Sequence, residues 1–367
     1  MLKKYRSLIT LCVMIVVLFG LTLTCWFKPT TAFSDTERRE LAKRPELSWS
    51  ALLDGTYMTK FEKWTQDQFP LRDRFRTLNA LSSTYVFRQK DNNDLYLSGG
   101  YLAKLDFPLD EKSIEYATSR FRYVYEQYLR DCGANVYLSV IPDKGYFLAE
   151  ANGYPHMDYE KLFSSMRGQM DFAKYIDITG TLSIGDYYKT DTHWRQENLG
   201  ETAAALASGM GITLKDTYTK NRLEHPFHGV YYGQAALPLP AETIWYLTSK
   251  TIDGCTVING ENNTEMGMYD MEKAVGKDPY QMFLSGSLSL ITIENPSATT
   301  DRELIIFRDS FGSSIAPLLA EGYAKITLVD IRYLSPALLG RFVDFNDKCD
   351  VLFLYSTLVL NSSSTIQ

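Results

Sequence analysis

Short apolar runs alternate with amphipathic runs along most of this chain. The apolar runs are rich in β-branched residues and end at turn residues, as strands do. We expect strands at residues 135–141, 174–178, 304–307, 325–329 and 351–355. Apolar residues spaced three and four apart predict helices at residues 113–131, 159–169, 197–210, 312–321 and 335–345. This alternation indicates an α/β fold with a parallel sheet covered by helices on both faces.

The N-terminal segment has a different pattern, because it is continuously apolar. Lys3, Lys4 and Arg6 precede an uncharged run from Leu8 to Phe27. A helix of about twenty apolar residues is long enough to cross the bilayer core. Small residues typical of a cleavage site do not end the run, so we expect residues 1–27 to form a short cytoplasmic stub and a transmembrane signal anchor. The positive residues ahead of the span predict a single-pass protein of the cell membrane, with the bulk of the chain extracytoplasmic.

The exported part divides into a neck and a main domain. Residues 28–94 are charged and aromatic, and residues 58–69 read as an amphipathic helix. A turn cluster at residues 91–94 precedes a short hairpin, so we expect the main domain to span residues 95–367. Within it, residues 221–293 are richer in Gly, Tyr and Pro, and they predict a strand-and-loop insertion beside the site.

Charge and cysteine content exclude several classes of protein. The net charge of −6 gives no basic surface for nucleic acid. Five cysteines occur singly, without the paired spacing of a zinc site or a disulfide framework. A disulfide among Cys132, Cys255 and Cys349 and three buried thiols are both compatible with the spacing. We expect neither a metal nor another cofactor.

One segment has the local pattern of a serine nucleophile. The apolar run 304–307 leads through Arg308-Asp309 to Ser310, and a helix is predicted to follow at once. Such a turn presents the serine at the carboxyl end of the sheet, and the N–H groups of the helix start point at the place where an oxyanion would form. Asp309 and Ser310 are also preferred helix-capping residues, so a purely structural role fits the same segment.

A serine hydroxyl needs a base, and the chain has four histidines. His193 follows Asp191 by two residues, so the carboxylate could orient the imidazole if the loop curls. His225 and His228 have metal-ligand spacing, but a surface strand explains them as well. The spacing alone therefore makes Asp191 and His193 candidates and no more.

A resemblance strengthens this assignment. Four stretches resemble the DHHW family, which is similar to the SGNH-hydrolase-like acetyltransferase domains of alginate O-acetylation proteins. They are Asp67-Gln68-Phe69-Pro70-Leu71-Arg72-Asp73, Ile141-Pro142-Asp143-Lys144, Asp191-Thr192-His193-Trp194 and Arg308-Asp309-Ser310-Phe311-Gly312. The resemblance implies an SGNH-hydrolase-like, flavodoxin-like sheet in which Ser310 is the nucleophile and His193 and Asp191 activate it.

The chain departs from the pattern of these families at two positions. Arg308 stands where SGNH hydrolases have glycine, and Thr192 stands at the second position of the motif that names the DHHW family. The glycine and asparagine donors of the usual oxyanion hole have no secure counterpart. The Ser310 N–H is the first candidate donor, and the further candidates for oxyanion or substrate binding are Asn295, Lys144, Gly286 and Trp194.

The resemblance implies an extracytoplasmic O-acetyltransferase that modifies a cell-envelope or secreted polysaccharide through an acyl-serine. The acceptor would be the polysaccharide, and the partner that delivers the acyl group would be a membrane-bound O-acyltransferase. The same triad could serve a carbohydrate esterase that removes acetyl groups. A catalytically inactive glycan-binding protein of the envelope is the third alternative.

Overall fold

The computed structural model describes residues 2–367, so Met1, the first residue of the expected cytoplasmic stub, lies outside the described residues. Two compact units make up the chain. The first contains the residues up to Asn92 together with Tyr232–Pro238, and the second contains Asn93–Tyr231 and Leu239–Gln367. The short segment 232–238 of the expected insertion therefore belongs to the first unit.

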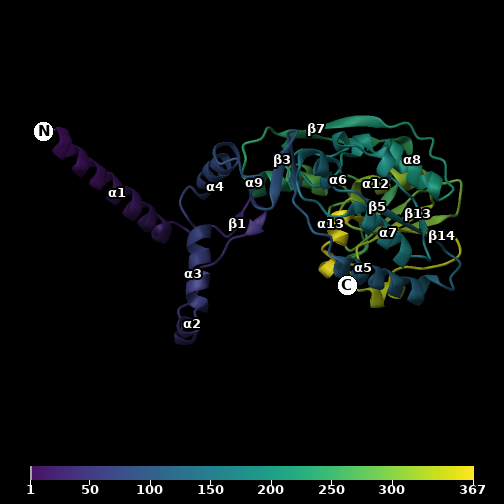
Figure 1. The fold of residues 1–367 in the computed structure, drawn as a ribbon. Helices are drawn as coiled ribbons and strands as arrows, with labels where there is room; N and C mark the ends of the chain where they lie inside the picture. Colours follow the sequence, from purple (N-terminus) through teal and green to yellow (C-terminus); the bar gives the residue numbers. More distant parts are fainter. Residues whose placement is uncertain (1) are drawn as a thin grey trace. The chain divides into compact units, whose positions relative to one another are not determined.

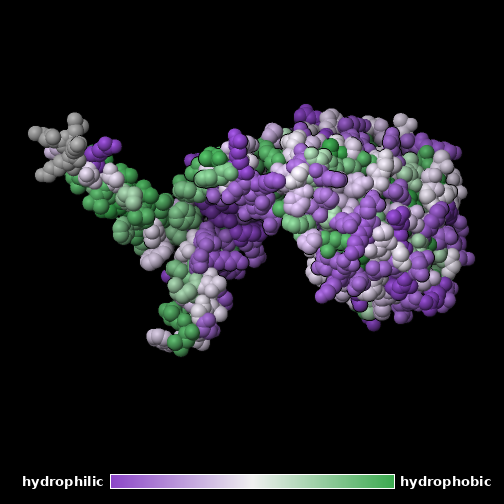
Figure 2. Space-filling model, viewed as in Figure 1, coloured by the Kyte–Doolittle hydropathy of each residue, from purple (hydrophilic) through white to green (hydrophobic). Residues whose placement is uncertain are grey.

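The first unit begins with the apolar helix α1 (Leu2–Phe27). Within residues 2–367, its segment Tyr5–Phe27 is the one stretch of helix that is long and apolar enough to cross a membrane. Figure 2 shows that hydrophobic residues make up most of the coloured surface of this helix. The predicted apolar N-terminal helix is confirmed, and a helix of this kind serves as a membrane anchor or as a signal sequence.

The rest of the first unit is built around the end of α3. Its elements are β1 (Phe33–Ser34), β2 (Arg39–Glu40), α2 (Trp49–Leu53), α3 (Thr56–Asp67) and α4 (Arg72–Leu81). The Asp67 carboxylate accepts two hydrogen bonds from Arg39, at 3.0 and 2.6 Å, and one from the Ala42 N–H at 2.8 Å. The Arg39 hydrogen bonds hold the pKa of the Asp67 carboxyl below its usual range. Next to it, the Gln68 side chain accepts from the Thr31 N–H and donates to the Thr31 carbonyl. These contacts tie residues 31–42 to the helix end.

The second unit is organised by an eight-stranded sheet with the order β10-β9-β11-β13-β12-β14-β5-β6. Figure 1 labels β5, β13 and β14 of this sheet. The strands from β13 to β6 are parallel, whereas β11, β9 and β10 are antiparallel to their neighbours. In chain order the strands of this sheet are β5 (Asn135–Ile141), β6 (Lys174–Tyr175), β9 (Thr256–Asn259), β10 (Thr264–Met266), β11 (Leu290–Glu294), β12 (Glu303–Arg308), β13 (Lys325–Val329) and β14 (Cys349–Ser356). Two separate hairpins are formed by β3 (Leu95–Ser98) with β4 (Tyr101–Lys104) and by β7 (Thr219–Phe227) with β8 (Glu242–Thr248).

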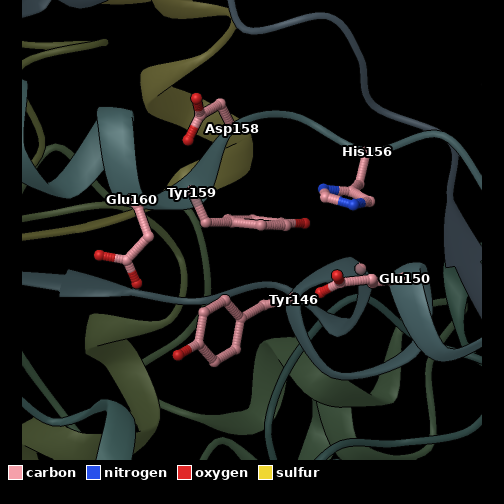
Figure 3. Close-up of a pocket in the computed structure, with 7 residues that line it drawn as sticks. Tyr146, Glu150, His156, Asp158, Tyr159 and Glu160 are labelled. Atoms are coloured by element: carbon pink, nitrogen blue, oxygen red, sulfur yellow. The ribbon is translucent and has the colours of Figure 1, made fainter.

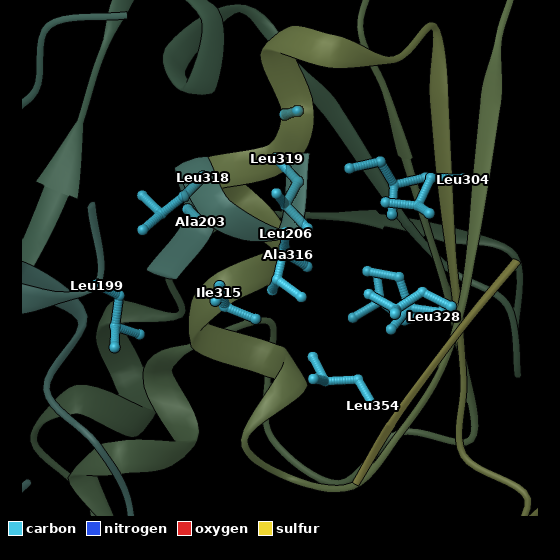
Figure 4. Close-up of a cluster of buried hydrophobic side chains, with 14 of the residues drawn as sticks. Leu199, Ala203, Leu206, Leu304, Ile315, Ala316, Leu318, Leu319, Leu328 and Leu354 are labelled. Atoms are coloured by element: carbon cyan, nitrogen blue, oxygen red, sulfur yellow. The ribbon is translucent and has the colours of Figure 1, made fainter. Parts of the chain in front are cut away.

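Helices cover both faces of this sheet. The unit contains α5 (Glu111–Val124), α6 (Lys144–Leu148), α7 (Tyr159–Gln169), α8 (Gly200–Gly209), α10 (Lys250–Gly254), α11 (Met271–Ala274), α12 (Gly312–Leu319) and α13 (Thr357–Leu360), and α9 (Val230–Ala235) continues into the first unit. On β12, Leu304 and Ile306 point into the core beneath α8 and α12, while Ile305 and Phe307 point into the core beneath α5 and α7. Figure 4 shows the first of these cores, in which leucines of α8 and α12 meet leucines of the sheet. Side chains of a strand alternate between the two faces, and both faces are buried. Every residue of a central strand must therefore be apolar or have a hydrogen-bonding or charged partner.

The predicted α/β fold, with a parallel sheet covered on both faces and an apolar helix ahead of it, is confirmed. Two details differ. The insertion adds three antiparallel strands to the edge of the sheet, because β9, β10 and β11 have apolar residues that complete the core next to β13. The helix expected at 335–345 is a 3₁₀ segment, Pro336–Arg341, in which Gly340 weakens any longer helix.

Removal of a ring from the second core should show how much this packing contributes to stability. Phe353 is fully buried, with its ring centroid 4.8 Å from that of Phe307 and 5.1 Å from that of Phe121. Phe353→Ala should lower the free energy of unfolding by about 3–5 kcal/mol, measured by urea titration of the detergent-solubilised chain. The exposed Tyr333 is the matched control, and Tyr333→Ala should change the free energy of unfolding by less than about 0.5 kcal/mol. Equal effects of the two substitutions would contradict this assignment of the core.

Candidate active site

Asp191, His193 and Ser310 form one hydrogen-bonded chain, although Ser310 lies 117 residues beyond His193 in the sequence. The Nδ1 of His193 lies 2.5 Å from Asp191 Oδ1, and its Nε2 lies 2.7 Å from Ser310 Oγ. An ionised carboxylate only accepts hydrogen bonds, so Nδ1 carries the proton and Nε2 is left to accept from the serine hydroxyl. The side chain of His193 is 13% exposed, so the relay is partly open to solvent.

The turn after β12 holds Ser310 in place without using its hydroxyl. Asp309 is fully buried, and its carboxylate accepts from the Phe311 N–H at 3.0 Å and from the Ser356 N–H at 2.8 Å. The first of these bonds closes the turn, and the second ties it to the end of the neighbouring strand β14. Helix α12 has no side-chain cap. Ser310 therefore does not cap α12, which is the structural role that the sequence also allowed.

Arg308 accounts for the departure from the glycine of SGNH hydrolases. Its side chain is buried and folds back over Gly312, where a Cβ would lie 2.7 Å from the Arg308 Cβ. The guanidinium donates to the Leu288 carbonyl at 3.1 Å and lies 3.8 Å from Asp330 Oδ2. Burial lowers the pKa of Arg308, and the nearby Asp330 carboxylate raises it. Gly312, two residues after Ser310, therefore provides the space that the Arg308 side chain needs.

Asp191 is buried and bound on both of its oxygens. Oδ1 accepts from the His193 N–H at 3.0 Å as well as from the ring, and Oδ2 accepts from the Val230 N–H at 2.8 Å. Burial raises the pKa of this carboxyl, but the charge of the His193 imidazolium and these hydrogen bonds outweigh it and hold the pKa well below the usual range. Asp191 therefore stays ionised, as a group that orients and stabilises an imidazolium must.

The loop that bears Asp191 is fastened by residues of the insertion. Glu242, at the start of β8, accepts from the N–H groups of Lys189 and Thr190 and from the Thr190 hydroxyl, at 2.7, 2.8 and 2.7 Å. The Gly229 backbone approaches Asp191 so closely that a Cβ there would collide with the Asp191 side chain. Residues of the segment 221–293 therefore supply part of the framework of the site.

Tyr280, also from the insertion, stacks on the imidazole. Its ring centroid lies 3.9 Å from that of His193, with 9° between the planes, and Phe311 packs at 5.0 Å from the same imidazole. The Tyr280 hydroxyl lies 2.9 Å from Ser314 Oγ, which also accepts from Trp194 Nε1 at 2.8 Å. Sequence reasoning missed Tyr280, because one of 25 tyrosines has no local pattern that marks it.

Lys144 lies behind Asp191 and not at Ser310. Its buried ammonium donates to the carbonyls of Tyr188 and Lys189, at 3.0 and 3.3 Å, and faces the Tyr231 ring at 4.9 Å. Burial lowers the pKa of Lys144 to about 7, although the charges of Asp191, Glu242 and Asp143 raise it. The geometry suits a residue that holds the loop before Asp191, because both of its hydrogen bonds go to carbonyls of that loop and none goes to Ser310.

The other expected donors do not reach the reacting end of the relay. Asn295 follows β11 at the amino edge of β12, roughly 17 Å of strand away from Ser310, and its Nδ2 donates to the Ala320 carbonyl. The Gly286 N–H donates to the Phe283 carbonyl, and Trp194 Nε1 is used by Ser314 and Phe311. Of the candidates named from the sequence, the Ser310 N–H alone has no protein acceptor within residues 2–367.

The arrangement can take a proton from Ser310 and hold the resulting imidazolium, so it can perform nucleophilic acyl chemistry. Within residues 2–367, no cluster of three or more His, Cys, Asp or Glu side chains could hold a metal ion, and all five cysteines are free.

Comparisons with known proteins match this chain by structure and not by sequence. No family model matches it, and no curated protein sequence matches it. A DHHW family protein from Eubacterium siraeum aligns with a TM-score of 0.60 at 20% identity, covering 75% of this chain and 95% of that chain. PatB1 of Bacillus cereus aligns with a TM-score of 0.56 at 18% identity, covering 72% and 96%, and a second structure of PatB1 contains a sulfonyl adduct. The O-acetyltransferase domain of Pseudomonas putida AlgJ aligns more loosely, with a TM-score of 0.45 at 12% identity, covering 73% and 92%. The resemblance to the DHHW family is thereby confirmed at the level of the fold.

The stacked ring of Tyr280 should matter for the reactivity of Ser310. Tyr280→Leu removes the aromatic face beside His193 and should slow covalent labelling of Ser310 by a sulfonyl fluoride about ten-fold. Tyr280→Phe is the matched control, since it keeps the ring and removes only the bond to Ser314, and its labelling rate should stay close to that of the wild type. If Tyr280→Leu and Tyr280→Phe slow the labelling of Ser310 equally, the Tyr280 hydroxyl and not its ring supports this reactivity.

Lys144 should make stability depend on pH with a definite sign. Lysine in the unfolded chain titrates near 10.5 and Lys144 in the folded chain near 7, so between these values the unfolded chain binds more protons. The cost of the buried ammonium is complete below pH 7 and declines as the pH rises. The free energy of unfolding of the wild type, minus that of Lys144→Met, should therefore rise by about 2 kcal/mol between pH 7 and pH 9. Urea titrations of both proteins at several pH values measure this difference, and a flat difference would contradict it.

Proposed function

We propose that this chain is an extracytoplasmic serine O-acetyltransferase that modifies a cell-envelope or secreted polysaccharide. The observation that carries the proposal is the unbroken relay from Asp191 through His193 to Ser310, with contacts of 2.5 and 2.7 Å. Its fold is similar to that of a DHHW family protein and of PatB1.

The proposed reaction has two halves that use the same residues. His193 Nε2 removes the Ser310 proton while Oγ attacks the carbonyl of the acetyl donor, and the imidazolium then returns that proton to the leaving group. In the second half, His193 removes the proton of a sugar hydroxyl, which attacks the acetyl-serine. Collapse of that intermediate transfers the acetyl group to the sugar, and the proton goes back to Ser310. Asp191 stays ionised throughout.

Stabilisation of the oxyanion is assigned to the backbone. The N–H of Ser310 has no protein acceptor within residues 2–367, and Ser310 lies two residues before the first residue of α12, next to the helix end whose N–H groups carry partial positive charge. Neither Asn295 nor Lys144 has a part in this step.

The location of the reaction follows from α1. Lys3, Lys4 and Arg6 stand ahead of the apolar span, and positive residues favour the cytoplasmic side. The catalytic unit would then face the outside, where acetyl donors made in the cytoplasm are absent. A membrane-bound O-acyltransferase that passes the acetyl group across is accordingly the proposed partner.

Removal of acetyl groups by the same triad is the second candidate. The relay is partly exposed, with 13% of the His193 side chain accessible, so water could replace the sugar hydroxyl as acceptor. The products distinguish these functions, because a transferase gives acetylated oligosaccharide and an esterase gives free acetate.

The full-length chain in detergent should be incubated with a chromogenic acetyl ester, with and without oligosaccharide acceptors. Ser310→Ala and His193→Ala should each lower turnover by roughly 10⁴-fold or more, and Asp191→Asn by roughly 10⁴-fold. A sulfonyl fluoride should label Ser310 in the wild type and leave Ser310→Ala unlabelled, which mass spectrometry detects. Turnover that survives in Ser310→Ala would exclude the acetyl-serine, and no turnover with any ester or acceptor would point to a glycan-binding protein.

A further inference from the structure

A cavity that the relay residues do not line opens in the second unit. It has a volume of about 600 Å³ and is lined by Gly145, Tyr146, Glu150, His156, Asp158, Tyr159 and Glu160. None of the three relay residues lines it. Figure 3 shows the rings of Tyr146 and Tyr159 between Glu160 on one side and Glu150 with His156 on the other. A space of this size is typical of a binding site for a small organic group.

The cavity lies on the edge of the sheet that carries Ser310. Gly145 and Tyr146 belong to α6, which directly follows β5, and Asp158 to Glu160 form the start of α7, which runs back along the sheet. Strand β5 pairs with β14, and β14 pairs with β12, whose carboxyl end leads to Ser310. Tyr159 and Tyr146 pack on the face of the sheet that α5 and α7 cover, whereas Trp194 and Phe311 beside the relay pack on the other face. Ligands of parallel sheets bind along this edge.

Helix α6 links the cavity to the relay. Lys144 points from α6 to the carbonyls that precede Asp191, while the next two residues line the cavity. Asp143 fastens this junction, because its carboxylate accepts from the Gly145 N–H at 2.7 Å and from the Tyr159 hydroxyl at 2.8 Å. Gly145 has no room for a side chain, since a Cβ there would lie 2.6 Å from the Tyr159 hydroxyl oxygen.

The lining combines aromatic rings with acceptors of hydrogen bonds. The His156 and Tyr159 rings are parallel to within 13°, with centroids 6.0 Å apart, and the Tyr146 ring stands edge-on to Tyr159 at 5.2 Å. Rings of this kind offer apolar faces to the C–H groups of a sugar, and carboxylates accept hydrogen bonds from its hydroxyl or amino groups.

The charge of the lining is one-sided. Within residues 2–367, no Lys or Arg forms an ion pair with Glu150, Asp158 or Glu160, and the nearby Lys161 is paired with Glu111. Three carboxylates without cationic partners would repel a ligand that carries carboxylates of its own and would attract one that carries an amine.

From these observations, and resting on the proposed function, we propose that the cavity binds a sugar unit of the acceptor glycan that carries no acidic group. Its carboxylates exclude glycans built from uronate units. The sugar held here would be another unit of the glycan whose hydroxyl reaches the acetyl-serine, so the cavity selects the polymer while the relay performs the transfer.

Binding to the full-length Ser310→Ala protein in detergent tests the proposal without turnover. Calorimetric titrations would use short chitosan, cellulose and polyuronate oligosaccharides. The first two should bind and the polyuronate should not. Glu150→Gln with Glu160→Gln should weaken chitosan binding roughly ten-fold. His156→Ala should weaken binding of both non-acidic oligosaccharides. The matched control is Glu294→Gln, an exposed carboxylate at the opposite edge of the same sheet, which should bind as the parent does.

Polyuronate binding as tight as that of the other oligosaccharides would overturn the proposal, as would chitosan binding that is unchanged in the Glu150 and Glu160 variant. Ester turnover by the wild type is measured separately. If that turnover depends on Ser310 while the cavity variants bind normally, the cavity assignment fails and the proposed function stands. If turnover is absent while the cavity binds as expected, the proposed function fails and the cavity assignment stands.

Discussion

The carboxylate of Asp309 makes the contact on which the candidate site depends. It is buried, and it joins the turn after β12 to Ser356, the last residue of β14, through bonds to the Phe311 and Ser356 N–H groups. A buried carboxylate is stable when hydrogen-bond donors replace its water, so the turn has little freedom to relax. Ser310 is thereby placed at the carboxyl edge of the sheet with its hydroxyl unused, and His193 can reach it.

The segment 221–293 contributes both to the candidate site and to the sheet. Glu242 and Val230 hold the loop of Asp191, and Tyr280 covers the imidazole of His193. The later part of the same insertion adds β9, β10 and β11 to the sheet. A rigid sheet edge carries Ser310, and a loop clamped from the other side carries its base. The geometry of the candidate relay is therefore fixed by the fold itself.

Two cationic side chains, Arg308 and Lys144, are buried near the candidate site. Arg308 is accommodated because Gly312 leaves room and because Asp330 and two backbone carbonyls surround its guanidinium. Lys144 is buried behind Asp191 among carbonyls and carboxylates. Each of these charges costs free energy to bury, and each is compensated by several partners instead of one.

Much of this protein follows from its sequence by itself. The apolar N-terminal helix and the parallel strands, with β5 and β13 at the expected bounds, follow from patterns that repeat within a few residues. Asp191, His193 and Ser310 were candidates because their residue types and local turns suit the chemistry. Only the tertiary structure decided that they meet, that Tyr280 stacks on His193 and that Asn295 lies at the opposite edge. Those contacts join segments many residues apart, and they depend on strand order and register, which no local pattern of side chains specifies.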